Sequence, residues 1–246
     1  MTRDDIIFGR RPVVEILEKG IKPDKILLQN GVDAEFSSRI RTLAKALEVQ
    51  VQVVPVQKLN SLTKAAHQGI ICFKAFVEYQ RVQHVVQRIY EDGHDPLLLL
   101  LDRVTDVRNL GAIARSAEVF GAQGLILPTA DSAPVNGEAV KASAGALLNI
   151  AVCREKSLLK TLDELHDLGI TSYAAELNAD KNLSDIPMKG PAVIVLGSED
   201  RGISNQLLAK VHHWFRIPQV GQTQSLNVSV AAGIVLYHAL MQRTRE

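Results

Sequence analysis

The apolar and polar positions of the chain follow a regular rhythm from residue 97 to the end. Short runs that are mostly apolar, without regular polar alternation, alternate with segments whose apolar residues recur every three or four positions. The runs lie at 97–101, 124–127, 150–153, 171–175, 192–196 and 214–217, and the intervening helical segments at 110–120, 137–146, 158–168, 205–211 and 226–241. Strands without polar alternation are typical of parallel sheets that helices cover on both faces. The pattern predicts an α/β fold built on such a sheet.

The first 77 residues predict a smaller α/β unit. Helices are expected at 12–19 and 35–48, and strands at 25–28, 51–54 and 69–77. Pro12 near the start of the first helix and Gly20 just after its end are suitable start and stop signals. The polar segment 78–95 is interpreted as a connecting helix followed by a loop. We therefore expect a domain at 1–77, a linker at 78–95 and a second domain at 96–246.

Composition is that of an ordinary globular protein, with 46% hydrophobic and 22% charged residues. The two cysteines, Cys72 and Cys153, lie in apolar stretches and favour a reducing compartment over a disulfide framework. No apolar stretch of the length found in a secretion signal follows the polar N-terminus, and no apolar run approaches the length of a membrane span. A cytoplasmic protein without membrane contact is therefore expected.

Charge alone does not indicate a nucleic-acid partner, since the net charge is only +1. The distribution is slightly uneven, because residues 1–80 hold 12 Lys/Arg against 9 Asp/Glu. Candidate chemistry comes instead from the loops at the carboxyl ends of the predicted parallel strands, where ligands of such sheets bind. These loops follow Leu101, Ala175, Leu196 and Ile217.

The first unusual loop, 102–116, contains Asn109 and, six residues later, Arg115. Gly111 and Ala112 keep the start of the following helix slim enough for another backbone to approach closely. A purely structural interpretation makes Asn109 the helix cap and Arg115 an ordinary surface charge. The loop alone does not decide between these interpretations.

The second loop joins a buried strand to Leu196-Gly197-Ser198-Glu199 and then to Asp200. Acidic side chains do not suit a phosphate cradle, which presents backbone N–H groups and cations. A neutral or cationic ligand, such as adenosine hydroxyls or a sulfonium, fits better. The alternative is a turn glycine followed by two solvated acids.

The third loop runs from Ile217 through a polar, glycine-containing stretch to Ser225, Leu226 and Asn227, and enters a helix of small residues. Ser225 is a candidate N-cap. Asn227 would lie inside that helix, where asparagine is unfavourable unless its side chain has a specific partner. This misfit indicates a functional role.

The sequence lacks the motifs that are typical of several other kinds of functional site. No G-x-G-x-x-G follows the first strand and no G-x-x-x-x-G-K-[ST] occurs, so neither dinucleotide nor Walker-type phosphate binding is indicated. His212 and His213 are adjacent, and no paired Cys or H-x-x-x-H spacing suggests a metal, so no metal site is expected. No nucleophile elbow with a Ser/His/Asp order is present.

The three loops together resemble the SpoU/TrmH family of SPOUT-class RNA 2'-O-ribose methyltransferases. The resembling motifs are Asn109-Leu110-Gly111-Ala112-Ile113-Ala114-Arg115, Leu196-Gly197-Ser198-Glu199 with Gly202, and Ile217-Pro218 followed by Ser225-Leu226-Asn227-Val228-Ser229-Val230-Ala231. Near the N-terminus, Phe8-Gly9-Arg10-Arg11-Pro12-Val13 and Ala66-His67-Gln68-Gly69-Ile70-Ile71 resemble the ribosomal-protein-like substrate-binding domain of the bacterial 23S rRNA (guanosine-2'-O-)-methyltransferase subgroup.

The resemblance implies a deep trefoil knot in the C-terminal domain, a homodimer, S-adenosyl-L-methionine as cofactor and RNA, with rRNA favoured, as substrate. It assigns the catalytic region to Arg115, Asn109, Glu199, Ser225 and Asn227. It assigns cofactor binding to Leu196, Gly197, Ile217 and Leu226. The N-terminal candidates for RNA contact are Arg10, Arg11, Arg39, Arg41, Lys45 and His67, although His67 has the alternative of a plain loop residue.

Three alternatives stay open at this point. In proposals for the family the arginine at the position of Arg115 abstracts a proton, but arginine stays protonated in proteins, so a purely electrostatic role is equally compatible. The substrate could be tRNA instead of rRNA. The chain could also be a non-catalytic RNA-binding or ribosome-assembly protein on the same fold.

Overall fold

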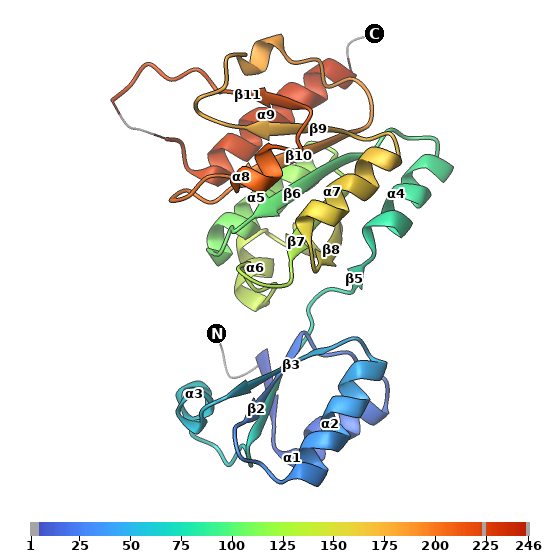
Figure 1. Ribbon diagram of the computed structural model, residues 1–246, viewed down its shortest axis with the longest axis vertical. Coiled ribbons are helices and arrows are strands. Elements are labelled where there is room, and N and C mark those ends of the chain that lie inside the picture. Colours follow the sequence, from blue (N-terminus) through green and yellow to red (C-terminus); the bar gives the residue numbers. More distant parts are fainter. Residues whose placement is uncertain (1–4, 223–224, 245–246) are drawn as a thin grey trace. The chain divides into compact units, whose positions relative to one another are not determined.

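The computed structural model describes residues 5–222 and 225–244. The chain forms two compact units, Met1–Phe76 and Val77–Glu246, and each is described by itself (Figure 1).

The N-terminal unit is a four-stranded mixed sheet in the order β1-β4-β2-β3. Its elements are β1 (Ile6–Phe8), α1 (Arg10–Glu18), β2 (Lys25–Gln29), α2 (Ala34–Ala46), β3 (Gln50–Val54), α3 (Val56–Leu62) and β4 (Ile70–Phe73). β2 pairs parallel to β3 and antiparallel to β4, which pairs antiparallel to β1. Residues of α1 and α2 pack with one set of strand residues, and Leu59 of α3 packs with the other set, so helices cover both faces.

The sequence analysis did not predict two elements of this unit, because they are short. β1 has three residues and α3 has seven, too few to display a period. The predicted strand 69–77 is also shorter in the structure, ending at Phe73.

The C-terminal unit contains a seven-stranded sheet in the order β11-β9-β10-β6-β7-β8-β5, and all its strand pairs are parallel. The predicted parallel sheet is confirmed. The strands are β5 (Tyr79–Gln80), β6 (Leu97–Asp102), β7 (Gly124–Pro128), β8 (Ala151–Glu155), β9 (Thr171–Ala175), β10 (Ala192–Gly197) and β11 (His213–Phe215).

Helices cover both faces of this sheet. Their bounds are α4 (Val82–Glu91), α5 (Val107–Val119), α6 (Gly137–Ala142), α7 (Leu158–Asp167), α8 (Asn205–Leu208) and α9 (Val228–Arg243), with 3-10 turns η2 (Ala146–Leu148) and η3 (Leu183–Asp185). Leu97, Leu99 and Leu101 of β6 pack in the core with α5, α6 and α9, whereas Leu98 and Leu100 pack with α4, α7 and α8. In the described part of the chain no helix is long and apolar enough to cross a membrane.

The segment 78–95 differs from the expected linker. β5 pairs with β8, and α4 buries Val82, Val85, Val86 and Ile89 in the core of the C-terminal unit. These four positions have helical spacing, so the polar residues between them simply form the exposed face of a packed helix. The boundary between the two units therefore lies after Phe76, before this segment.

The chain changes direction across the sheet between β6 and β10. From β6 the strands proceed to β7 and β8 on one side, and the later strands β9 to β11 lie on the other side. Such a switch point leaves a crevice at the carboxyl ends of the two central strands. The register places Gly197 opposite Asp102 at this edge.

Both cysteines are buried and unbonded. Burial raises the pKa of the Cys72 and Cys153 thiols to about 12, so both stay protonated at neutral pH. They act as small apolar core residues.

The last helix is held at its end by Arg243, which donates to the backbone carbonyls of Asp95 (3.0 Å), Pro96 (3.0 Å), Met188 (3.2 Å) and Gly190. Five residues earlier, His238 Nε2 lies 3.0 Å from Ile186 O. Burial lowers the pKa of the Arg243 guanidinium from its ordinary value. The arginine thus ties α9 to the segments that lead into β6 and β10.

Arg243→Ala should lower the free energy of unfolding by about 2–4 kcal/mol, because several carbonyls lose a charged donor at once. Denaturant unfolding of the full chain measures the change. Gln242→Ala, one residue earlier on the same helix, should leave the midpoint nearly unchanged. Equal effects of the two substitutions would refute the role of Arg243.

Candidate active site

Three polar side chains from three different loops meet at the carboxyl edge of the sheet. Glu199 Oε1 accepts from Asn109 Nδ2 at 2.9 Å, from the backbone N–H of Val228 at 3.4 Å and from Asn227 Nδ2. Asn227 Nδ2 also lies 3.0 Å from Asn109 Oδ1. Among the described residues nothing donates to Glu199 Oε2, so one carboxylate oxygen remains available for a ligand hydroxyl or cation.

Asn109 does not cap its helix. The N-cap of α5 is Asp106, whose carboxylate accepts from the backbone N–H of Arg108 (2.7 Å) and of Asn109 (3.0 Å). Asn109 therefore lies in the first turn, where its side chain is free to reach Glu199. The interpretation of Asn109 as the cap of this helix is wrong.

Asn227 has two roles. It is the N-cap of α9, accepting from Ser229 N at 2.9 Å through Oδ1, while its Nδ2 serves the cluster with Glu199. The helix begins at Val228, two residues later than predicted, so Ser225 is not its cap. The asparagine that seemed misplaced inside a helix lies instead at its boundary, the position that asparagine favours.

Gly197 lets the loop after β10 fold back on the strand. A Cβ at this position would lie 2.1 Å from the carbonyl carbon of Gly202 and 2.3 Å from Ile203 N. Gly202 N in turn donates to Ser198 O at 2.9 Å. The tight return of the backbone carries Glu199 to the edge of the sheet. Gly111 serves close packing as well, but against α6, where an added Cβ would lie 2.5 Å from Ala142 Cβ.

Asp102 and Arg103 hold the same loop from β6, and the sequence interpretation did not select either of them. Asp102 is buried and accepts from Ser204 N at 2.7 Å. Arg103 Nη2 donates to Gly202 O at 3.1 Å, and its Nε lies 3.5 Å from the Asp102 carboxylate. Arg103 has a left-handed backbone, φ 59°. The sequence did contain a signal that could have identified Asp102, because it is an acidic residue at the end of an otherwise apolar strand.

Arg115 and Ser225 are exposed and are not joined to the cluster by any contact among the described residues. Arg115 follows Asn109 by six helical residues, which places it about 9 Å further along the axis and about 120° around it. Within one chain the helix therefore directs these two side chains to different sides. Thr223 and Gln224, which precede Ser225, lie outside the described residues.

The four residues expected at the cofactor lie along the same edge with different burial. Leu196 is part of the core, whereas Gly197, Ile217 and Leu226 are half-buried. The ends of β10 and β11 are separated by β9, a spacing of about 9–10 Å for two strand intervals. No group of His, Cys, Asp or Glu suited to a metal ion occurs in ranges 5–222 and 225–244.

The residues of the N-terminal unit that are candidates for RNA contact differ in whether they form ion pairs and whether they are exposed. Arg10 is paired with Asp33 (2.7 Å) and Arg39 with Glu18 (2.6 Å). Three other candidates are exposed on α1 and α2: Arg11, Arg41 and Lys45. His67 is buried, so it is placed to orient neighbours more than to contact RNA directly.

Gly197→Ala should destabilise the C-terminal unit by about 1–3 kcal/mol, because the clashing atoms are backbone and have little room to move. It should also displace Glu199 and weaken ligand binding at this edge. Thermal unfolding and calorimetry with S-adenosylmethionine measure the two effects. Gly190→Ala is the matched control, since an added Cβ there meets no atom within 4 Å. Wild-type stability in Gly197→Ala would contradict the close approach.

The site lies in a segment that matches a known family. Residues 96–237 match the SpoU rRNA Methylase family, and residues 6–80 match a domain described as RNA 2'-O ribose methyltransferase substrate binding. A Staphylococcus aureus protein named as a TrmH family tRNA/rRNA methyltransferase is 35% identical over 240 residues, covering 98% of this chain and 97% of the relative.

Solved structures agree in fold. A TrmH family RNA methyltransferase structure from Porphyromonas gingivalis is 28% identical, with a TM-score of 0.58 over 96% of this chain and 88% of that one. The SpoU methyltransferase AviRb from Streptomyces viridochromogenes, solved with AdoMet, is 24% identical, with a TM-score of 0.62 over 97% and 90% of the chains. The chain therefore belongs to the SpoU/TrmH family of RNA methyltransferases.

Proposed function

We propose that this chain transfers a methyl group from S-adenosylmethionine to a ribose 2'-hydroxyl of RNA, acting as a cytoplasmic homodimer. The proposed substrate is a guanosine of large-subunit rRNA. The observation that carries the proposal is the cluster of Asn109, Glu199 and Asn227 at the switch point of the sheet, within the segment that matches the SpoU family.

The residues at this edge fit S-adenosylmethionine. The exposed Glu199 and Asp200 suit a sulfonium cation and ribose hydroxyls better than a phosphate. Half-buried Ile217 and Leu226 offer apolar surface for an adenine ring. When bound, the cofactor supplies the methyl group. AdoMet is also present in the structure of AviRb, which has the same fold.

The side chains of this chain then have distinct tasks. Asn109 and Asn227 hold the Glu199 carboxylate in place, and its free oxygen can orient a ribose by accepting from a hydroxyl. The proposed task of Arg115 is to clamp a phosphate of the substrate and to stabilise negative charge that develops on the 2'-oxygen. Charge stabilisation requires no deprotonated guanidinium. The 2'-hydroxyl requirement makes RNA, not DNA, the substrate.

The dimer is proposed from an apolar surface next to Arg115. On α9, Val230, Ile234 and Tyr237 are 50%, 37% and 53% exposed and recur on one face of the helix. Val119, 63% exposed, lies one turn after Arg115 on α5, which packs against α9 through the contact of Phe120 with Tyr237. A second copy covering this surface would place Arg115 beside the interface.

The preference for rRNA is supported by the model that matches residues 96–237, whose description names rRNA methylation. The name of the S. aureus relative includes tRNA as well. Transfer of tritiated methyl groups to unmodified rRNA and tRNA transcripts distinguishes the two substrates. Ribose-methylation maps of rRNA with and without the gene should differ by one guanosine. A protein that binds no S-adenosylmethionine in calorimetry would be a non-catalytic member of the fold.

Arg115→Ala should lower methyl transfer by about 100-fold or more, as removal of a charge-stabilising donor does in other enzymes. Arg115→Lys should keep part of the activity if charge is the main requirement, whereas its total loss would favour a role that needs guanidinium geometry. Lys160→Ala, an exposed charge on α7, serves as the control. Wild-type turnover by Arg115→Ala would reject both roles.

Tyr237→Glu should convert a dimer into a monomer, because it places a charge in the apolar surface that the second copy covers. Light scattering coupled to gel filtration measures the mass. Leu168→Glu places the same charge at an exposed apolar residue outside this surface and should leave the dimer intact. A dimeric Tyr237→Glu variant or a monomeric wild type would contradict this interface.

A further inference from the structure

Two histidines and a serine of the C-terminal unit form a cluster that includes no residue of the proposed methyl-transfer site. His166 is in the last turn of α7, Ser172 is on β9, and His212 is in the segment between α8 and β11. The two imidazole rings lie against each other, with their centroids 4.0 Å apart and their planes inclined by 36°. Ser172 is fully buried and contacts both histidines. The cluster therefore joins three segments of the chain at one point.

Ser172 and His212 exchange hydrogen bonds in both directions. The backbone N–H of Ser172 donates to His212 Nδ1 at 3.2 Å, and the backbone N–H of His212 donates to Ser172 Oγ at 3.0 Å. The same hydroxyl lies 2.8 Å from Nε2 of His166 and 3.2 Å from Nδ1 of His212. Because Nδ1 accepts a backbone N–H, the His212 ring carries its proton on Nε2. His212 thus fits its place as a neutral imidazole.

A second proton on the His212 ring opposes this arrangement. It would have to bind Nδ1, where it would face the N–H of Ser172 in place of a lone pair. The ring would have to turn away, and the N–H of Ser172 would lose the acceptor that the structure gives it. A buried donor without an acceptor destabilises the folded state. His212 is exposed, so protons from the solvent have access to it.

The charges around His166 also favour its neutral form. Burial lowers the pKa of His166, and the neighbouring His212 and Lys210 lower it further, against the opposing effect of Asp163 and Asp167. Lys210 forms an ion pair with Asp163, so their effects on the ring largely cancel. A proton on both His166 and His212 would place two like charges on rings that lie against each other.

His213 borders the cluster and responds to pH in the same direction. Its ring stacks on Tyr173 at a centroid distance of 5.4 Å and lies 6.5 Å from that of His212. Burial lowers the pKa of His213, and Lys181 and His212 contribute in the same direction. A histidine whose pKa is lowered by folding contributes stability above the ordinary value of about 6.5, and this stability is lost as the pH falls through the folded pKa.

We propose that His166, Ser172 and His212 form a proton-sensitive clamp on the start of β11. With neutral rings the clamp ties the segment between α8 and β11 to α7 and β9, and protonation of the rings below about pH 6.5 releases it. β11 leads into Ile217, so release also loosens the segment to which the proposed function assigns cofactor binding. Only this last consequence rests on the proposed function.

The single tryptophan of the chain reports on the clamp. Trp214 lies on β11, two residues after His212, and its Nε1 donates to Leu208 O at 3.0 Å. Urea unfolding of the full chain, followed by the emission wavelength of Trp214, therefore measures the release of β11. The unfolding constant is compared at about pH 7.5 and about pH 5.5, on either side of the ordinary pKa of histidine.

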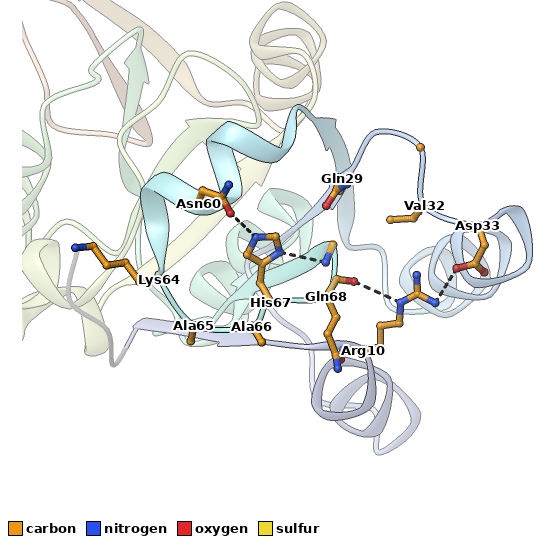
Figure 2. Close-up of a pocket in the computed structure, with 12 residues that line it drawn as sticks. Arg10, Gln29, Val32, Asp33, Asn60, Lys64, Ala65, Ala66, His67 and Gln68 are labelled. Carbon is orange, nitrogen blue, oxygen red and sulfur yellow. Dashed lines mark hydrogen bonds and ion pairs between the residues drawn. The ribbon is translucent and has the colours of Figure 1, made fainter.

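A local probe is needed because the N-terminal unit also contains a buried histidine. His67 Nδ1 accepts from Gly69 N at 3.1 Å, and its Nε2 lies 2.8 Å from Asn60 Oδ1 (Figure 2). Protonation of His67 therefore disturbs hydrogen bonds of its own unit. Trp214 belongs to the other unit, so its emission does not follow the unfolding of residues around His67.

The decisive variant combines His166→Gln with His212→Asn. The side-chain oxygen of Asn can replace Nδ1 as acceptor, and the amide of Gln can replace Nε2, but neither amide takes up a proton in this pH range. Each proton excluded from the folded wild type raises its unfolding constant about tenfold per pH unit below pH 6.5. The ratio of the unfolding constants at the two pH values should therefore be about tenfold smaller in the double variant. His84→Asn, which removes an exposed histidine of α4, should keep the wild-type ratio.

An equal ratio in the wild type and the double variant would overturn the proposal. Nitrogen-15 NMR of the imidazoles in the wild type decides the matter if the double variant fails to fold, because a proton on Nδ1 of His212 at neutral pH would contradict the clamp. Calorimetry with S-adenosylmethionine separates this proposal from the proposed function. A pH-sensitive clamp in a chain that binds no cofactor would refute the proposed function alone, whereas cofactor binding with equal ratios would refute the clamp alone.

Discussion

The parallel pairing of β6 with β10 is the constraint on which the candidate active site depends. It sets Gly197 opposite Asp102 at the point where the strand order diverges, so two loops leave the sheet side by side. The missing side chain at Gly197 lets the second loop return onto its own strand. Asp102 and Arg103 from the first loop then hold it through Ser204 N and Gly202 O. The position of Glu199 follows from these backbone contacts.

Glu199 in turn connects parts of the chain that are far apart in sequence. Its Oε1 accepts N–H groups from the first turn of α5 and from the first residues of α9. A carboxylate with several donors at one oxygen is held in one orientation, and charge-assisted bonds of this kind are stronger than neutral ones. The carboxylate is therefore preorganised, and its second oxygen needs no rearrangement to accept a ligand.

The two units use positive charge in different ways. In the N-terminal unit, Arg10 is neutralised by Asp33 and Arg39 by Glu18. In the C-terminal unit, Arg103 and Arg243 donate hydrogen bonds to backbone carbonyls and so hold separate segments of the fold together. Arg115 is exposed on α5, beside an apolar surface. An arginine in the sequence is thus a candidate for function only once its partners are known.

The sequence by itself determined the parallel α/β architecture, the strands of its centre and the three loops of the site, because buried strands and amphipathic helices have periods that local residues display. The resemblance of its motifs to those of the SpoU/TrmH family also pointed to Asn109, Glu199 and Asn227, which the structure brings together. Only the tertiary structure decided that Asp106 caps α5, that segment 78–95 packs into the sheet, and that Asp102 and Arg103 support the Glu199 loop. It likewise decided that Arg10 and His67 are held by neighbours. Most of these features depend on contacts between residues 23 to 102 positions apart, and the others on cap geometry or on the short-range contact of His67 with Asn60. No local pattern of apolar and polar residues encodes them.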